Sequence, residues 1–193
     1  MRWEERLLGV FEDLEQQAEG LALEERDATV AELAPGEYAR VDLSARLHAS
    51  LGLPLVLDVA GHGRLTGRLL RAGRDWLLLE EGPGGPGSPE SLVRTAALRV
   101  AHGVSPLARG EEARSVAARL GVASALRGLA DERGPVRLSL LDGRHLRGRL
   151  VRVGADFLEL AEDAGGYVAE PYGEPEPAPA LVAFAALAVI TRV

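Results

Sequence analysis

Alternating arginines are the residues of this sequence best suited to chemistry, because a guanidinium group binds a phosphate or carboxylate through paired hydrogen bonds. Arg147 and Arg149 alternate with apolar residues or glycine, so in a strand they share one outward face. Basic residues are concentrated in two segments of the sequence. One group is Arg144, His145, Arg147, Arg149 and Arg152, and the other is His62, Arg64, Arg68, Arg71 and Arg74. Within these groups, the candidate contacts for RNA or for a protein partner are Arg144, Arg147, Arg149, Arg64 and Arg68.

A solvated strand face is the alternative interpretation of these arginines. Glu159 and Glu162 lie on the next expected strand, and each surface ion pair with them would contribute only ~0–1 kcal/mol. A nucleic-acid site usually combines net basic charge with interleaved aromatic residues. Residues 53–193 instead hold 17 acidic residues and 17 arginines, and only 4% of the chain is aromatic. The sequence therefore favours the solvated face, with RNA binding as the alternative.

Other polar groups predict neither catalysis nor a metal site. The four histidines, at positions 48, 62, 102 and 145, include no pair at ligand spacing. Asp75 and Asp156 each precede an aromatic residue, and capping a turn through backbone N–H groups is the favoured role over acid or base catalysis. The glycines between 82 and 87 lack the following Lys-Ser or Lys-Thr of a phosphate-binding loop. We expect no enzyme activity, no metal and no cofactor.

An internal repeat supplies the elements that position these residues. Residues 54–80 align without a gap on residues 135–161, with 11 of 27 positions identical, and residues 92–101 match 181–190 in 6 of 10 positions. The offset rises from 81 to 89 between the two blocks, which indicates a longer loop in the second copy. Repeated segments are framework, so the sequence predicts two similar units.

Each copy predicts short, bent strands. Apolar residues alternate, a tight glycine turn follows, and Gly67 or Gly148 then interrupts a strand, which marks a bend or a close backbone approach. The aromatic residue that begins the next strand, Trp76 or Phe157, is predicted to lie in the core or to plug the mouth of a barrel. A short helix is expected before each copy, capped by Asp42 or Ser44 and running to Leu51 in the first, and from about 111 to 131 in the second.

The first 40 residues predict an acidic amphipathic helical region. Trp3, Leu7, Phe11 and Leu14 follow one another at helical spacing, and residues 1–52 hold 12 acidic residues against 5 arginines. This face could pack on the first unit or form a partner-docking or coiled-coil helix, which gives a route to a homo-oligomer. Residues 23–41 give no clear secondary-structure signal.

The repeated pattern resembles the small, SH3-like β-barrel of the Sm, LSm and Hfq group. The residues that carry the resemblance are Asp142-Gly143, Leu146-x-Gly148-x-Leu150, Asp156-Phe157-Leu158 and the strand 181–190, with a short helix before them. The resemblance does not carry RNA binding over residue by residue, because Gly154 and Leu158, or Gly73 and Leu77, stand where the Sm group has its RNA-binding Asp and Asn. The Tyr-Lys-His run typical of Hfq is also replaced, by residues 182–184 and 93–95.

We therefore expect a mainly β protein with helices (α+β): residues 1–40 form an N-terminal helical region, and residues 41–104 and 105–193 each form a short helix followed by an Sm-like barrel. The sequence has no cysteine and no apolar run near the ~20 residues of a membrane span, which favours a cytoplasmic protein without membrane contact. The expected function is protein interaction or scaffolding with an unknown protein partner. RNA association through the arginine-bearing faces is the alternative.

Overall fold

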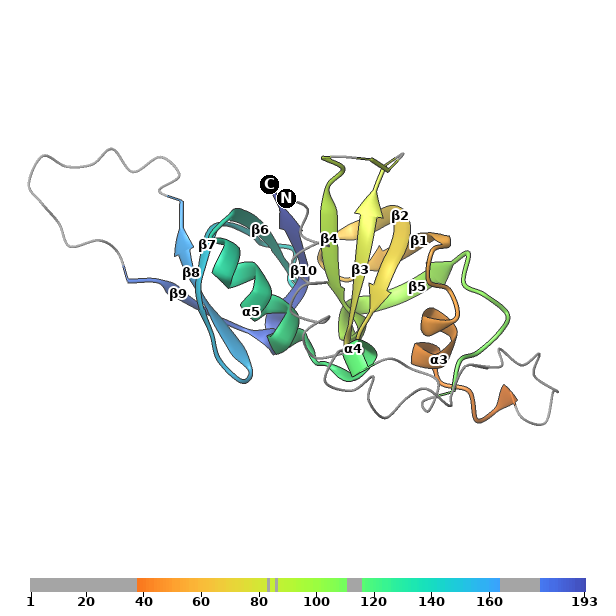
Figure 1. The fold of residues 1–193 in the computed structure, drawn as a ribbon. Coiled ribbons are helices and arrows are strands. Elements are labelled where there is room, and N and C mark those ends of the chain that lie inside the picture. Colours follow the sequence, from red (N-terminus) through yellow and green to blue (C-terminus); the bar gives the residue numbers. More distant parts are fainter. Residues whose placement is uncertain (1–37, 83, 86, 111–115, 164–177) are drawn as a thin grey trace, which may run out of the picture.

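A computed structural model describes residues 38–82, 84–85, 87–110, 116–163 and 178–193 (Figure 1). The predicted amphipathic helix with Trp3, Leu7, Phe11 and Leu14 lies outside these residues, as do most of residues 23–41. The described chain is mainly β with a few short helices, as expected. None of the described helices is long and apolar enough to cross a membrane.

Both repeats begin with helix and continue with five strands. The first contains α3 (Leu43–His48), β1 (Pro54–Val59), β2 (Gly63–Ala72), β3 (Trp76–Glu81), β4 (Glu90–Arg94), the 3₁₀ turn η1 (Thr95–Ala97) and β5 (Leu98–His102). The second contains α4 (Val116–Arg119), α5 (Val122–Glu132), β6 (Pro135–Leu140), β7 (His145–Val153), β8 (Phe157–Glu162), β9 (Ala180–Ala183), the 3₁₀ turn η3 (Phe184–Ala186) and β10 (Leu187–Arg192).

The ten strands of the described residues form one open antiparallel sheet in the order β5-β1-β2-β3-β4-β10-β6-β7-β8-β9. Each repeat contributes five strands in the same relative order, and the two halves meet where β4 pairs with β10. Figure 1 shows the two halves side by side, each with its own helix. Among the described strands, β5 and β9 lie at the two edges and have one neighbour each.

Two hydrophobic cores lie on opposite faces of this sheet. Alternate residues of a strand point to opposite faces, and at the meeting point of the repeats this alternation divides side chains between the cores. Val93 of β4 and Val189 of β10 belong to the core of the first repeat. Leu92 and Ile190, their neighbours along the chain, belong to the core of the second. The central strands are therefore buried on both faces, and each repeat supplies side chains to the core of the other.

The helices lie over the strands of their own repeats, α3 against β2 and α5 against β7. Asp42 caps α3 by accepting a hydrogen bond from the Ala45 N–H, one of the two predicted caps, but α3 ends at His48 rather than near Leu51. The prediction of one continuous helix over 111–131 is wrong, because Leu120 and Gly121 separate α4 from α5. The cause is contact with the first repeat, described below.

Gly148 is required by a close approach of neighbouring backbones, as predicted from its position inside a strand. A Cβ atom at Gly148 would lie 2.0 Å from the carbonyl oxygen of Ala161 on β8. At the equivalent Gly67, the Cβ would lie 2.5 Å from the carbonyl oxygen of Glu80 on β3. The repeated glycine therefore lets the neighbouring strand backbone approach closely in both repeats.

Candidate interaction surfaces

Arg147 and Arg149 are exposed on one face of β7, as the sequence predicts, and a third arginine joins them. Arg147 lies directly opposite Arg137 of β6 in the strand register, and Arg149 lies opposite Pro135. We call Arg137, Arg147 and Arg149 the arginine patch. No described acidic residue forms an ion pair with any of the three; the pair found on this hairpin is Arg152 with Glu159, at 3.0 Å. Glu162 lies opposite Gly148, so it points to the face of the sheet away from Arg147 and Arg149.

Arg137 was missed by the sequence analysis, because its counterpart in the first repeat is Val56 and it therefore breaks the repeat. Its alternation with Val136 and Leu138 was the available signal. Like charges placed directly opposite each other on neighbouring strands destabilise a sheet. An anion bound between Arg137 and Arg147 would remove that cost.

Arg144 lies in the turn before β7 and is held by its own loop. Its backbone N–H and its Nε both donate to the Asp142 carboxylate, at 3.0 and 2.7 Å. These two bonds, the backbone one first, lower the pKa of Asp142. The Arg144 side chain remains 73% exposed, so it can still meet a partner, but it starts from an existing ion pair.

Arg64 and Arg68 do not join the arginine patch. They are exposed on the face of β2 opposite to Leu65 and Leu69, which lie in the first core. Followed strand by strand, the register places that first core on the same face of the sheet as Arg147. The two predicted groups of arginines consequently lie on opposite faces of the sheet and cannot form one surface. Arg68 also donates to the Gly52 carbonyl, at 2.8 Å.

A serine links histidines of the two repeats next to the arginine patch. The Oγ of Ser139 on β6 is hydrogen-bonded to Nδ1 of His62, at 2.9 Å, and to Nδ1 of His145, at 3.1 Å. Burial is the main cause of a lowered pKa at His62, with smaller lowering by His145 and Arg137 and an opposing effect of Glu81. His62 is half-buried, because its turn docks on the second repeat. Gly61 allows this contact: its φ is +69°, and a Cβ there would lie 1.8 Å from the Leu140 carbonyl oxygen.

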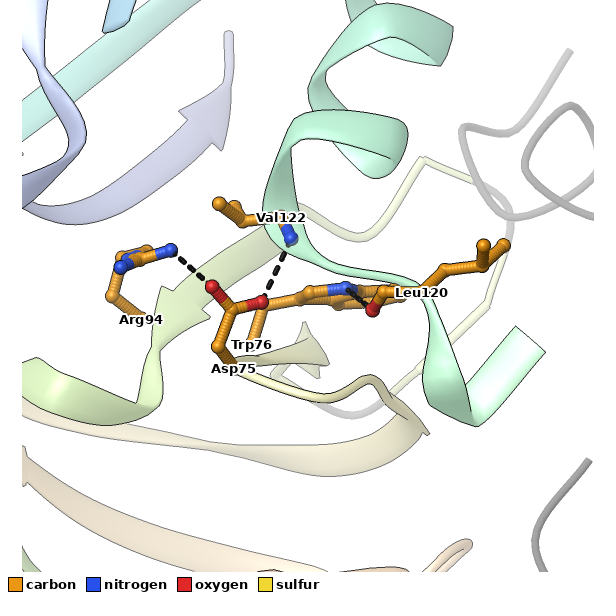
Figure 2. Close-up of polar contacts among 5 residues, drawn as sticks. All are labelled: Asp75, Trp76, Arg94, Leu120 and Val122. Carbon is orange, nitrogen blue, oxygen red and sulfur yellow. Dashed lines mark hydrogen bonds and ion pairs between the residues drawn. The ribbon is translucent and has the colours of Figure 1, made fainter. Parts of the chain in front are cut away.

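Asp75 forms a second link between the repeats (Figure 2). One carboxylate oxygen accepts from the backbone N–H of Val122, the first residue of α5, at 2.8 Å. The other accepts from Arg94 of β4, at 2.7 Å, and the Arg94 side chain is only 13% exposed. Asp75 caps backbone N–H groups as predicted, but it caps a helix of the other repeat instead of its own turn. An acid at a helix N-terminus also interacts favourably with the helix dipole.

Trp76 completes this link by holding the interruption between α4 and α5. Its Nε1 donates to the carbonyl oxygen of Leu120, at 3.0 Å (Figure 2). The backbone N–H of Arg74 donates to the same oxygen, at 3.1 Å. The Leu120 carbonyl therefore bonds to the first repeat, and the helix restarts at Val122. Trp76 is 1% exposed and lies in the core of the second repeat, so its predicted burial is confirmed.

Polar side chains also join β3, β4 and β10. Ser91, fully buried, donates to the Glu81 carboxylate. Thr191 Oγ1 lies 2.7 Å from Ser91 Oγ and donates to it, since the serine proton is already used. Every buried hydroxyl in this chain of contacts thus has a partner, as a buried polar group requires.

In the second repeat, the residues at the positions of Trp76 and Leu92 are exposed to solvent. Phe157, the counterpart of Trp76, is 36% exposed, so its predicted role as a core residue is wrong. Leu181 of β9 is 69% exposed, whereas its counterpart Leu92 of β4 is fully buried. The register pairs Leu181 with Glu159 and Ala183 with Phe157, which places Leu181 and Phe157 on one face. We call Leu181, Phe157 and the unpaired edge of β9 the β9 surface.

The described residues hold no group of three or more His, Asp or Glu side chains arranged to bind a metal ion. No protein-family model matches the chain, and no curated protein matches its sequence.

Proposed function

We propose that this chain is a cytoplasmic, non-enzymatic protein-interaction or scaffolding protein built on two Sm-like units, and that the β9 surface is its binding site. The observation that carries the proposal is the contrast between matched residues of the repeats. Leu92 and Trp76 are 0% and 1% exposed, while Leu181 and Phe157 are 69% and 36% exposed. An apolar residue kept at an uncovered strand edge favours pairing with another chain.

The binding mode is the addition of a strand to β9. An extended segment of the partner would pair its backbone N–H and C=O groups with the free edge, and its side chains would pack on Leu181 and Phe157. Complete burial of one leucine side chain stabilises by about 1.5–3 kcal/mol. Main-chain pairing supplies the rest of the affinity, and the apolar side chains supply selectivity.

The test compares proteins captured from cells by tagged wild type and by the Leu181→Glu variant, after nuclease treatment. Leu51→Glu is the matched control, because Leu51 is 40% exposed and lies outside both edge strands. We expect partners that bind wild type and the control but are lost with Leu181→Glu. An identical set of bound proteins for all three chains would overturn the proposal.

RNA association is a second candidate, supported by the arginine patch. Arg137 and Arg147 lie opposite each other with no described acidic partner, and phosphate would relieve their repulsion. The Arg147→Glu, Arg149→Glu double variant should abolish RNA binding in a gel-shift assay with little change in melting temperature, and wild-type binding should weaken steeply with salt. Replacing Arg64 and Arg68 on the opposite face is the control. An unchanged shift in the double variant rejects the patch as an RNA site.

A further inference from the structure

The two repeats meet at a junction formed by β4 on one side and β10 on the other. Because the chain is a repeat, each of these two strands has a counterpart elsewhere in the sheet. Val93 pairs with Val189, Leu92 with Ile190 and Ser91 with Thr191 across this junction. At the repeat offset of 89, β9 is the counterpart of β4, and β5 is the counterpart of β10. These counterparts are the two edge strands of the sheet. One edge therefore carries the first half of the junction and the other edge carries the second half.

The side chains that cross the internal junction have apolar counterparts at the edges. Leu92 and Val189 each leave their own repeat and enter the core of the other, and both are fully buried. Their counterparts are Leu181 and Val100, which are 69% and 44% exposed. Both edges thus present an apolar side chain at the position that enters a neighbouring core.

We infer that the partner of the β9 surface is a second copy of this chain, whose β5 pairs antiparallel with β9. This inference rests on the proposed function and names its partner. The internal junction gives the register: Val182 opposite Val100, Leu181 opposite Ala101, and Ala180 opposite His102 of the next copy. The pairing joins two different edges, so it is heterologous and builds a closed ring or a filament.

Three replacements make the junction between copies weaker than the internal one. Glu159 stands at the position of Leu78, and Arg99 stands at the position of Ala188. Asp142 stands at the position of Gly61, whose missing side chain allows the internal turn contact. The junction between copies keeps the strand pairing and the apolar side chains of the internal junction, but it lacks the turn contact. Assembly between copies should therefore be reversible and depend on protein concentration.

Two single variants and their mixture test this arrangement. Leu181→Glu blocks the β9 edge and Val100→Glu blocks the β5 edge, and both positions are exposed enough for each chain to keep its fold, which circular dichroism checks. Masses are measured by sedimentation and native mass spectrometry on the full chain. We expect concentration-dependent assembly for wild type and for the Leu51→Glu control, and a monomer for each edge variant alone. The mixture of the two edge variants should form a dimer that grows no further, since one intact β9 edge and one intact β5 edge remain.

A monomeric wild-type chain, or a mixture that forms no dimer, would overturn the inference. Assembly that persists in both edge variants would also overturn it and would favour the N-terminal segment with Trp3 and Leu7, which the sequence predicts to be helical, as the contact. The proposed function fails separately. If wild type is monomeric but Leu181→Glu still loses a captured protein of another kind, the interaction site stands and only its partner is wrong. If wild type is monomeric and Leu181→Glu captures the same proteins, both are wrong.

Discussion

Asp75 is hydrogen-bonded on both carboxylate oxygens to segments that are distant in sequence. It caps α5 and neutralises Arg94, whose side chain is largely but not fully buried. Loss of a helix cap costs about 0.5–2 kcal/mol, and an uncompensated buried group adds about 1–3 kcal/mol. This single residue is therefore a sensitive probe of the contact between the repeats.

We expect Asp75→Ala to lower the free energy of unfolding by roughly 2 kcal/mol or more. Asp156→Ala is the matched control, because Asp156 occupies the same repeat position, is exposed, and has no described side-chain hydrogen bond. Its effect should stay within about 0.5 kcal/mol. Urea unfolding of both variants measures the difference, and equal effects would show that the α5 cap contributes nothing particular.

His62 predicts a dependence of stability on pH. Its pKa in the folded chain lies below 6.5, chiefly through burial, so the unfolded chain binds the proton more readily. The contribution of neutral His62 is complete above about pH 6.5 and is lost as the pH falls toward the folded-state pKa. The melting temperature of wild type should therefore fall more on acidification than that of His62→Asn, which keeps a polar atom near the Nδ1 position. His102→Asn, at an exposed histidine, should follow wild type; parallel curves for all three chains would contradict the role of His62.

At the scale of the elements, Gly148 determines how closely β7 and β8 approach. A methyl group there would meet the β8 backbone, so Gly148→Ala should cost about 1–3 kcal/mol through forced displacement of the strands. Gly110→Ala is the control, since no atom lies within 4 Å of a Cβ at that position. Thermal melting monitored by circular dichroism compares the two, and a neutral Gly148→Ala would mean that the strands separate easily.

The sequence predicted local structure well and contacts between the repeats poorly. Alternation, turn glycines and the Asp42 cap are signals carried by neighbouring residues, and the strands and α3 follow them. The break at Leu120 and the partial burial of His62 depend on groups in the other repeat, to which no local pattern points. One signal was available: residues 77–79 are all leucine, a continuous apolar run typical of a strand buried on both faces, whereas Glu159 interrupts the counterpart.

The arginines illustrate the same limit at the candidate site. Alternation with apolar residues predicted correctly that Arg147 and Arg149 are exposed on one strand face. That Arg64 and Arg68 of the first repeat lie on the opposite face follows only from the way β4 joins β10. Because the two repeats bury opposite faces of one sheet, equivalent surfaces point away from each other.

At the scale of the whole molecule, the two repeats should unfold together. β10 lies between β4 and β6 and supplies Val189 to one core and Ile190 to the other. We expect one calorimetric transition at a protein concentration where the chain is monomeric, with equal calorimetric and van't Hoff enthalpies. Val189→Ala and Ile190→Ala should each lower the midpoint temperature of that single transition. Ile190→Ala should lower the free energy of unfolding by about 2–5 kcal/mol. A separate transition for either repeat would contradict shared cores.

The position of β10 also has a consequence for synthesis on the ribosome. Of the ten strands that the structure describes it is the last to be translated, yet the sheet places it in the middle. Until it emerges, the growing chain exposes the edge of β4, and each core lacks the two side chains that β10 supplies to it. Translation proceeds at about 5–20 residues per second. The first repeat must therefore wait for roughly ninety residues of later sequence before its core is closed, and during that interval a chaperone or a neighbouring nascent chain could bind the same edge.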